Sequence, residues 1–179
     1  MFRVIIPFIS QPMLQGLLIL NCLLCLSYAS ANEALTLKTE NLVGQSTLKV
    51  FAWEIYHSEL YTEDGRYDES TDNYVLKITY LRDITQQQLI KQTYKQLSKL
   101  GVDESIYQRY DAQLKQLWPD VSKGDSLSAH IQPTGTDFYF NGNAIGSVKG
   151  ADFGPMFGSI WLSPNTSQPD LRKQLIGAL

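Results

Sequence analysis

Arg82 is the residue whose type and position most directly suggest chemistry. In the stretch YVLKITYLR, residues 74–82, apolar and polar residues alternate as in a β-strand, and Tyr80 and Arg82 fall on the more apolar face. A guanidinium offers five donors in a planar fork, which suits a carboxylate or another oxyanion. The pattern leaves two roles for Arg82: an anion clamp at the end of an apolar pocket, or a structural pair with an acid or with helix carbonyls.

A second group of candidate residues lies in the aromatic stretch LKVFAWEIYHSELY, residues 48–61. A histidine such as His57 is a candidate general base, but a general base needs an orienting partner, and the sequence shows none. We therefore interpret His57 as structural and assign no catalytic residue. Tyr56 is expected either in the wall of a cavity or in the core. The predicted ligand-binding residues are Arg82, Tyr80 and Tyr56, and no metal site or cofactor is predicted.

The elements that must position these residues follow from hydrophobic spacing and turn signals. Strands are expected over residues 35–38, 48–61, 74–82 and 127–132, with a hairpin over 137–148 that turns at Asn141-Gly142, and Gly44 is expected to break the chain. Helices are expected from a capping pair at Thr85 and Gln88, from Asp103 to Trp118, over 152–161, and from Pro169. Strands and helices do not alternate strictly, which predicts an α+β fold: a long antiparallel sheet backed by a layer of helices.

The first 31 residues predict a secretory signal peptide rather than part of the fold. An apolar run interrupted by Asn21 is followed by Ala29-Ser30-Ala31, a small-x-small cleavage pattern. The run is shorter than the roughly 20 apolar residues of a membrane span. We therefore expect one mature domain over residues 32–179, periplasmic or secreted, with no stable membrane span after cleavage.

The composition of residues 32–179 excludes several classes of function. Both cysteines, Cys22 and Cys25, lie in the predicted signal peptide, and the only histidines are His57 and His130. This excludes a thiolate nucleophile and a histidine-rich metal site. With 14 basic and 18 acidic residues the net charge is −4 and no basic cluster occurs, which argues against nucleic acid and anionic lipid surfaces as partners.

Five stretches in order resemble the chalcone isomerase superfamily, and more narrowly its exported bacterial chalcone isomerase-like branch. They are LKVFAWEIYHSELY (48–61), YLRDIT (80–85), WPDVSKGDSL (118–127), FYFNGNAIG (138–146) and FGSIWLSPNTSQPDLRKQLIG (157–177). The resemblance implies an open-faced β-sandwich with a ligand cleft between the sheet and the helices. It also implies that the superfamily's functions, isomerisation of chalcones and binding of fatty acids, are the ones to consider.

The residues of the true isomerases do not carry over to this sequence. Those enzymes use an arginine just upstream of the long strand and a threonine within it; residues 40–48 contain no arginine, and the threonine position falls near Tyr56. The reaction needs a cation to stabilise the phenolate and the developing enolate. The leading hypothesis is therefore a non-catalytic binder of a small apolar or amphipathic, fatty-acid-like molecule. The alternatives are an isomerase or lyase of phenolic enones and an envelope protein-interaction module.

Overall fold

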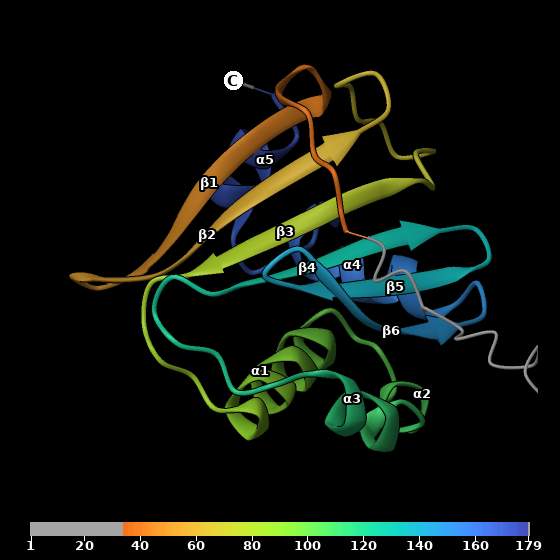
Figure 1. Ribbon diagram of the computed structural model, residues 1–179. Coiled ribbons are helices and arrows are strands. Elements are labelled where there is room, and N and C mark those ends of the chain that lie inside the picture. The colour runs from red at the N-terminus through yellow and green to blue at the C-terminus, as the bar shows by residue number, and fades with distance from the viewer. Residues whose placement is uncertain (1–33, 179) are drawn as a thin grey trace, which may run out of the picture. The chain divides into compact units, whose positions relative to one another are not determined.

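A six-stranded antiparallel sheet forms the centre of the molecule in the computed structural model, which describes residues 34–178. Each strand pairs with the next along the chain, so the order in the sheet is β1-β2-β3-β4-β5-β6 (Figure 1). The strand bounds are β1 Leu42–Val50, β2 Trp53–Thr62, β3 Tyr74–Tyr80, β4 Ser126–Gln132, β5 Gly135–Phe140 and β6 Asn143–Lys149. The predicted signal peptide lies outside the described residues.

Five α-helices cover one face of this sheet, which we call the inner face (Figure 1). A short 3-10 helix, Thr39–Asn41, precedes β1, and the α-helices are α1 Gln86–Lys99, α2 Glu104–Gln108, α3 Asp111–Leu117, α4 Phe153–Leu162 and α5 Pro169–Leu175. The α+β prediction, a long antiparallel sheet backed by helices, is confirmed. Within residues 34–178, no helix combines the length and apolar character needed to cross a bilayer.

Local sequence signals correctly predicted where several helices and turns begin. Thr85 and Gln88 form the capping box of α1: the Thr85 hydroxyl accepts from the Gln88 N–H, and the Gln88 side chain accepts from the Thr85 N–H. Asp103 caps α2 by accepting from the Ser105 N–H. In the β5–β6 turn both Asn141 and Gly142 have positive φ, as the predicted turn requires.

The predicted long strand over residues 48–61 is wrong, because the chain reverses near the start of this stretch. β1 ends at Val50, Phe51 and Ala52 form a two-residue turn, and β2 begins at Trp53. Gly44, which was expected to break the chain, lies inside β1. The reversal was missed because the turn contains no glycine, asparagine or proline; Phe51 itself adopts a φ of 55°.

Two further predictions differ from the structure. The single helix expected from Asp103 to Trp118 is divided into α2 and α3, which meet at Arg109 and Tyr110. The opening strand expected over residues 35–38 does not form. Instead, these residues cross the outer face of the sheet, held by a bridge between Ala34 and Asn143 and by the Leu35 N–H donating to the Gly142 carbonyl (Figure 1).

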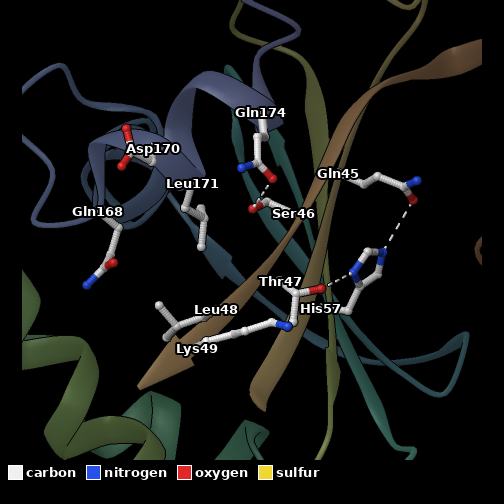
Figure 2. A pocket seen from close by; sticks show the side chains of 10 residues that line it. All are labelled: Gln45, Ser46, Thr47, Leu48, Lys49, His57, Gln168, Asp170, Leu171 and Gln174. Atoms are coloured by element: carbon white, nitrogen blue, oxygen red, sulfur yellow. Dashed lines mark hydrogen bonds between the residues drawn. The ribbon is translucent and has the colours of Figure 1, made fainter. Parts of the chain in front are cut away.

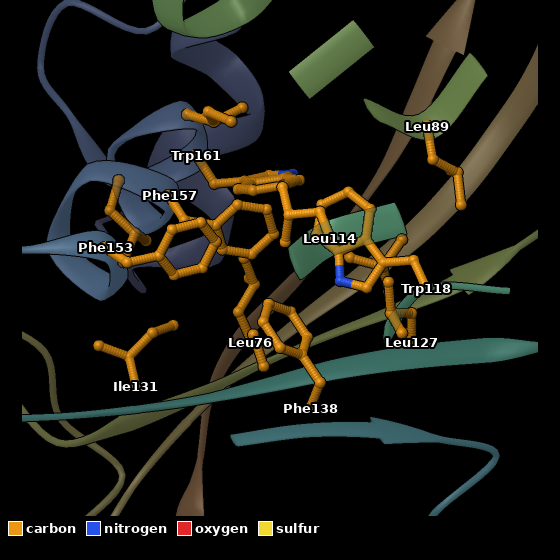
Figure 3. Close-up of a cluster of buried hydrophobic side chains, with 14 of the residues drawn as sticks. Leu76, Leu89, Leu114, Trp118, Leu127, Ile131, Phe138, Phe153, Phe157 and Trp161 are labelled. Carbon is orange, nitrogen blue, oxygen red and sulfur yellow. The ribbon is translucent and has the colours of Figure 1, made fainter. Parts of the chain in front are cut away.

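Aromatic rings occupy the centre of the layer between the sheet and the helices (Figure 3). Phe138 on β5 is fully buried, and its ring centroid lies within about 6 Å of the rings of three other residues: Trp118 at 5.6 Å, Phe157 at 5.9 Å and Phe153 at 6.0 Å. Phe157 on α4 also lies 5.2 Å from the ring of Trp161. These rings join strand β5 and the end of helix α3 to helix α4 in one apolar core.

Candidate functional site

Tyr56 and Tyr80 lie next to each other on the inner face, as a ligand site there would require. They are direct partners in the register of β2 and β3. The Tyr56 hydroxyl accepts a hydrogen bond from Trp161 Nε1 at 2.9 Å, which ties the middle of the sheet to α4. Tyr80 is buried, so both side chains face the helical layer rather than water.

Burial keeps both of these phenols neutral. It raises the pKa of Tyr56 to about 12, an effect that the hydrogen bond from Trp161 partly opposes. Burial also raises the pKa of Tyr80, and the neighbouring Tyr56 adds to the increase. At neutral pH the inner face therefore presents hydroxyl groups, which can donate or accept hydrogen bonds, but no phenolate.

Arg82 does not close the inner face, and this part of the sequence prediction is wrong. β3 ends at Tyr80, and the hydrogen bond from the Leu81 N–H to the Ile55 carbonyl of β2 lies one residue beyond it, so Arg82 follows the strand and does not continue its alternation. The Arg82 side chain is exposed, and its guanidinium carbon lies 5.5 Å from the centroid of the Trp53 ring. None of the ion pairs among residues 34–178 involves Arg82. A role for it in ligand binding stays a prediction.

A pocket of about 530 Å³ lies at the edge of the sheet, between β1 and α5 (Figure 2). Its volume is in the usual range for a small-molecule site. Helix α5 approaches β1 closely at Gly44, where there is no side chain to hold the two elements apart. The pocket is lined by Gln45, Ser46, Thr47, Leu48, Lys49, His57, Gln168, Asp170, Leu171 and Gln174.

Hydrogen bonds fix the polar side chains of this pocket. The two ring nitrogens of His57 lie 3.0 Å from the Thr47 hydroxyl and 3.3 Å from the Gln45 side-chain carbonyl oxygen (Figure 2). The Ser46 hydroxyl donates to the Gln174 side-chain oxygen at 2.9 Å, which joins β1 to α5. His57 thus has the orienting partners that its sequence context did not reveal, since Gln45 and Thr47 lie across the unpredicted hairpin.

The apolar wall of the pocket continues into the inner face of the sheet. Leu48, which lines the pocket, is the register partner of Tyr56, and Tyr56 is the partner of Tyr80. Side chains of direct partners on antiparallel strands lie side by side on one face. Leu48, Tyr56 and Tyr80 therefore form a row that leads from the pocket toward the centre of the layer between sheet and helices. At the middle of this row, Tyr56 is hydrogen-bonded to Trp161.

The layer also contains a buried donor that no described residue satisfies. Trp118 is 3% exposed, and its Nε1 has no hydrogen-bond partner within residues 34–178. Most buried N–H groups in proteins are paired, because desolvating an unpaired donor costs free energy. The ring of Phe157 packs on the rings of both Trp118 and Trp161. It therefore links the unpaired Trp118 Nε1 to the side chain that donates to Tyr56.

A second, smaller pocket of about 260 Å³ lies on the outer face, below the crossing segment of residues 35–38. Its wall includes Tyr61, Val75 and His130. Neither pocket is lined by Arg82, Tyr80 or Tyr56. Among the described residues, no group of three or more histidine, cysteine, aspartate or glutamate side chains is placed to hold a metal ion.

The meander sheet, the single helical layer and the aromatic interface define an α+β open-faced β-sandwich. The family model described as chalcone isomerase-like matches residues 28–177, and the chain therefore belongs to the chalcone isomerase-like family. An uncharacterized protein of Haemophilus influenzae is 26% identical over 135 residues, which are 75% of this chain and 67% of that protein.

The fold is also similar to a solved structure from a plant. The crystal structure of a fatty-acid binding protein of Arabidopsis thaliana matches with a TM-score of 0.57 and 10% sequence identity, covering 80% of this chain and 90% of that one. At this level of identity the match shows a common fold. What this chain binds has to be argued from its own residues.

Proposed function

We propose that this chain binds a small amphipathic molecule of the fatty-acid type and does not transform it. The observation that carries the proposal is the β1–α5 pocket, which has polar side chains at its rim and an apolar wall that leads into the row Leu48, Tyr56 and Tyr80. Membership in the chalcone isomerase-like family and the fold shared with a plant fatty-acid binding protein support the same class of ligand.

The polar rim suits the head group of such a ligand. The ammonium of Lys49 and the side-chain N–H groups of Gln174 can donate to a carboxylate, while both ring nitrogens of His57 are already engaged by Thr47 and Gln45. Lys49 also forms an ion pair with Glu54 at 2.7 Å, on an exposed part of the hairpin where such a pair contributes little. A ligand carboxylate therefore competes with Glu54 at a small cost.

The hydrocarbon part of the ligand would follow the row toward the helical layer. Leu48 and Leu171 provide the apolar contacts at its start, and the rings of Tyr56 and Tyr80 provide them further in. Passing Tyr56 requires its hydrogen bond to Trp161 to open, which costs about 1–3 kcal/mol because a hydrocarbon chain satisfies neither group. In this arrangement Tyr56 and Tyr80 are wall residues, while Arg82 lies outside the path.

The proposal includes the compartment, which rests on the sequence pattern of residues 1–31. A signal peptide there would place the mature domain in the periplasm or outside the cell. Lipophilic molecules dissolve poorly in the water of that compartment. A protein with an apolar site behind a polar rim could carry them.

Filling the pocket should weaken ligand binding strongly without unfolding the protein. Leu48 is only half-buried, and the bulky Leu48→Trp side chain would occupy the start of the row. With dodecanoate as the probe, native mass spectrometry should detect a one-to-one complex for the parent protein and binding at least about tenfold weaker for the variant.

The matched control is Ile106→Trp, which adds the same ring on α2, away from the pocket, at a side chain that is 39% exposed. It should bind dodecanoate as the parent does. If the parent shows no complex, and solvent extraction of the purified protein releases no lipophilic molecule, the proposal is wrong. Equal binding by parent and Leu48→Trp would instead move the site away from this pocket.

A further inference from the structure

The tip of the β1–β2 hairpin gathers exposed apolar side chains. Val50, Phe51 and Trp53 are 45%, 98% and 65% exposed, and they are three of the four large hydrophobic residues exposed within residues 34–178. The hairpin extends past the end of its neighbour β3, at the left of Figure 1. We call residues 50–53 the apex. Such a concentration of apolar surface at one projecting point marks a contact site more often than a chance exposure.

The fold does not need a phenyl ring at this position. Phe51 is the first central residue of a two-residue hairpin loop and has a φ of 55°. Glycine is preferred where such a loop requires positive φ, and a bulky residue there is strained. Since its ring is almost completely in water, Phe51 gains no packing that offsets this strain. The ring is therefore best explained by something that it contacts outside the chain.

Two cationic side chains, Arg82 and Lys49, lie next to the apex. The Arg82 guanidinium lies over the Trp53 ring at 5.5 Å and forms none of the ion pairs found among the described residues. Lys49 precedes the apex and is paired with Glu54, and Asp83 follows Arg82 in the chain, so the charges next to the apex balance. This order, with apolar rings in front and a cation behind, matches the depth profile of a bilayer interface, where acyl chains are followed by phosphates.

We propose that the apex inserts into the head-group region of a zwitterionic phospholipid bilayer, with Phe51 deepest and Arg82 at the level of the phosphates. A stable protein interface engages about 20–30 residues on each side, far more than a four-residue apex provides, whereas a bilayer accepts a single aromatic finger. The net charge of −4 on residues 32–179 disfavours a strongly anionic surface. This inference goes beyond ligand binding and rests on the apex and Arg82, none of which lines the β1–α5 pocket.

Tryptophan fluorescence gives a direct test with the full chain. The three tryptophans are Trp53, Trp118 and Trp161, and only Trp53 is exposed. Vesicles of phosphatidylcholine should shift the emission to shorter wavelength, and phosphatidylcholine with brominated acyl chains should quench it. Phe51→Gly should bind these vesicles about tenfold more weakly, while its thermal unfolding temperature should equal or exceed that of the parent, because glycine relieves the strained φ.

Ile106→Ala is the matched control, since it removes an exposed apolar side chain on α2 and should leave vesicle binding unchanged. Three results would each overturn the proposal: no emission shift with phosphatidylcholine, binding that appears only when phosphatidylglycerol is added, or equal vesicle affinities of the parent and Phe51→Gly. None of these results bears on dodecanoate binding, so the two proposals fail separately.

Discussion

Gly44→Ala should destabilise the protein by about 2–3 kcal/mol and open the β1–α5 pocket. A Cβ atom at Gly44 would lie 2.2 Å from the Gln174 carbonyl oxygen and 2.7 Å from the Leu175 carbonyl oxygen. Both oxygens belong to backbone near the end of α5, so no side chain can rotate away. The helix has to move off β1, and the hydrogen bond from Ser46 to Gln174 is lost with it. Chemical denaturation would give the loss of unfolding free energy.

A second glycine separates this steric effect from ordinary backbone strain. Gly101 follows α1 with a φ of 79° and has no atom within 4 Å of a built Cβ. Gly101→Ala should therefore cost about 1 kcal/mol through backbone strain alone and leave dodecanoate binding unchanged. Gly44→Ala should lower both stability and binding. Equal effects of the two variants on binding would show that close packing of α5 on β1 does not form the site.

Raising the pH from about 10 to 12 should progressively destabilise the protein, because several buried phenols are kept neutral in the folded state. Burial raises the pKa of Tyr56 to about 12 and raises those of Tyr74 and Tyr80 as well. The unfolded chain releases these protons near the ordinary tyrosine value of about 10. Between the unfolded and folded pKa values the unfolded state binds fewer protons, so the free energy of unfolding falls. Tyr56 alone accounts for about 2–3 kcal/mol.

Tyr56→Phe tests this assignment through a pH profile. The variant loses the hydrogen bond from Trp161 and should be about 1 kcal/mol less stable at neutral pH. Its free energy of unfolding should then fall less steeply than that of the parent between pH 10 and 12. Circular dichroism during denaturant titrations at each pH would measure both slopes. Parallel slopes would mean that the Tyr56 phenol is not held neutral by the fold.

The elements that the sequence predicted well are those determined by neighbouring residues. The capping box of Thr85 and Gln88 and the turn at Asn141-Gly142 need contacts only a few residues apart, and both formed as expected. The α+β class followed from the order of strand and helix patterns. The five matching stretches led to the correct family, because their order along the chain reflects the whole fold.

The errors occur where long-range contacts decide the structure. The Phe51-Ala52 turn has no turn chemistry of its own, so the pairing of β1 with β2 must impose it. Arg82 was placed by extending the alternation of β3 two residues past the point where the strand ends. At the β1–α5 pocket, Ser46 bonds to Gln174, which is 128 residues away in the sequence. No local sequence pattern predicts such a contact. The hairpin also explains why the neighbours of His57 were not recognised.

The most direct test of the central claim is a ¹⁵N NMR titration of the protein with dodecanoate, followed through the three tryptophan indole signals. Our account predicts a saturable shift of the Trp161 signal as its hydrogen bond to Tyr56 opens, and a smaller shift of Trp118 through the intervening Phe157. Trp53, on the hairpin apex, should not move. Unchanged Trp161 and Trp118 signals at saturating dodecanoate, or a shift confined to Trp53, would contradict a ligand site between β1, α5 and the aromatic layer.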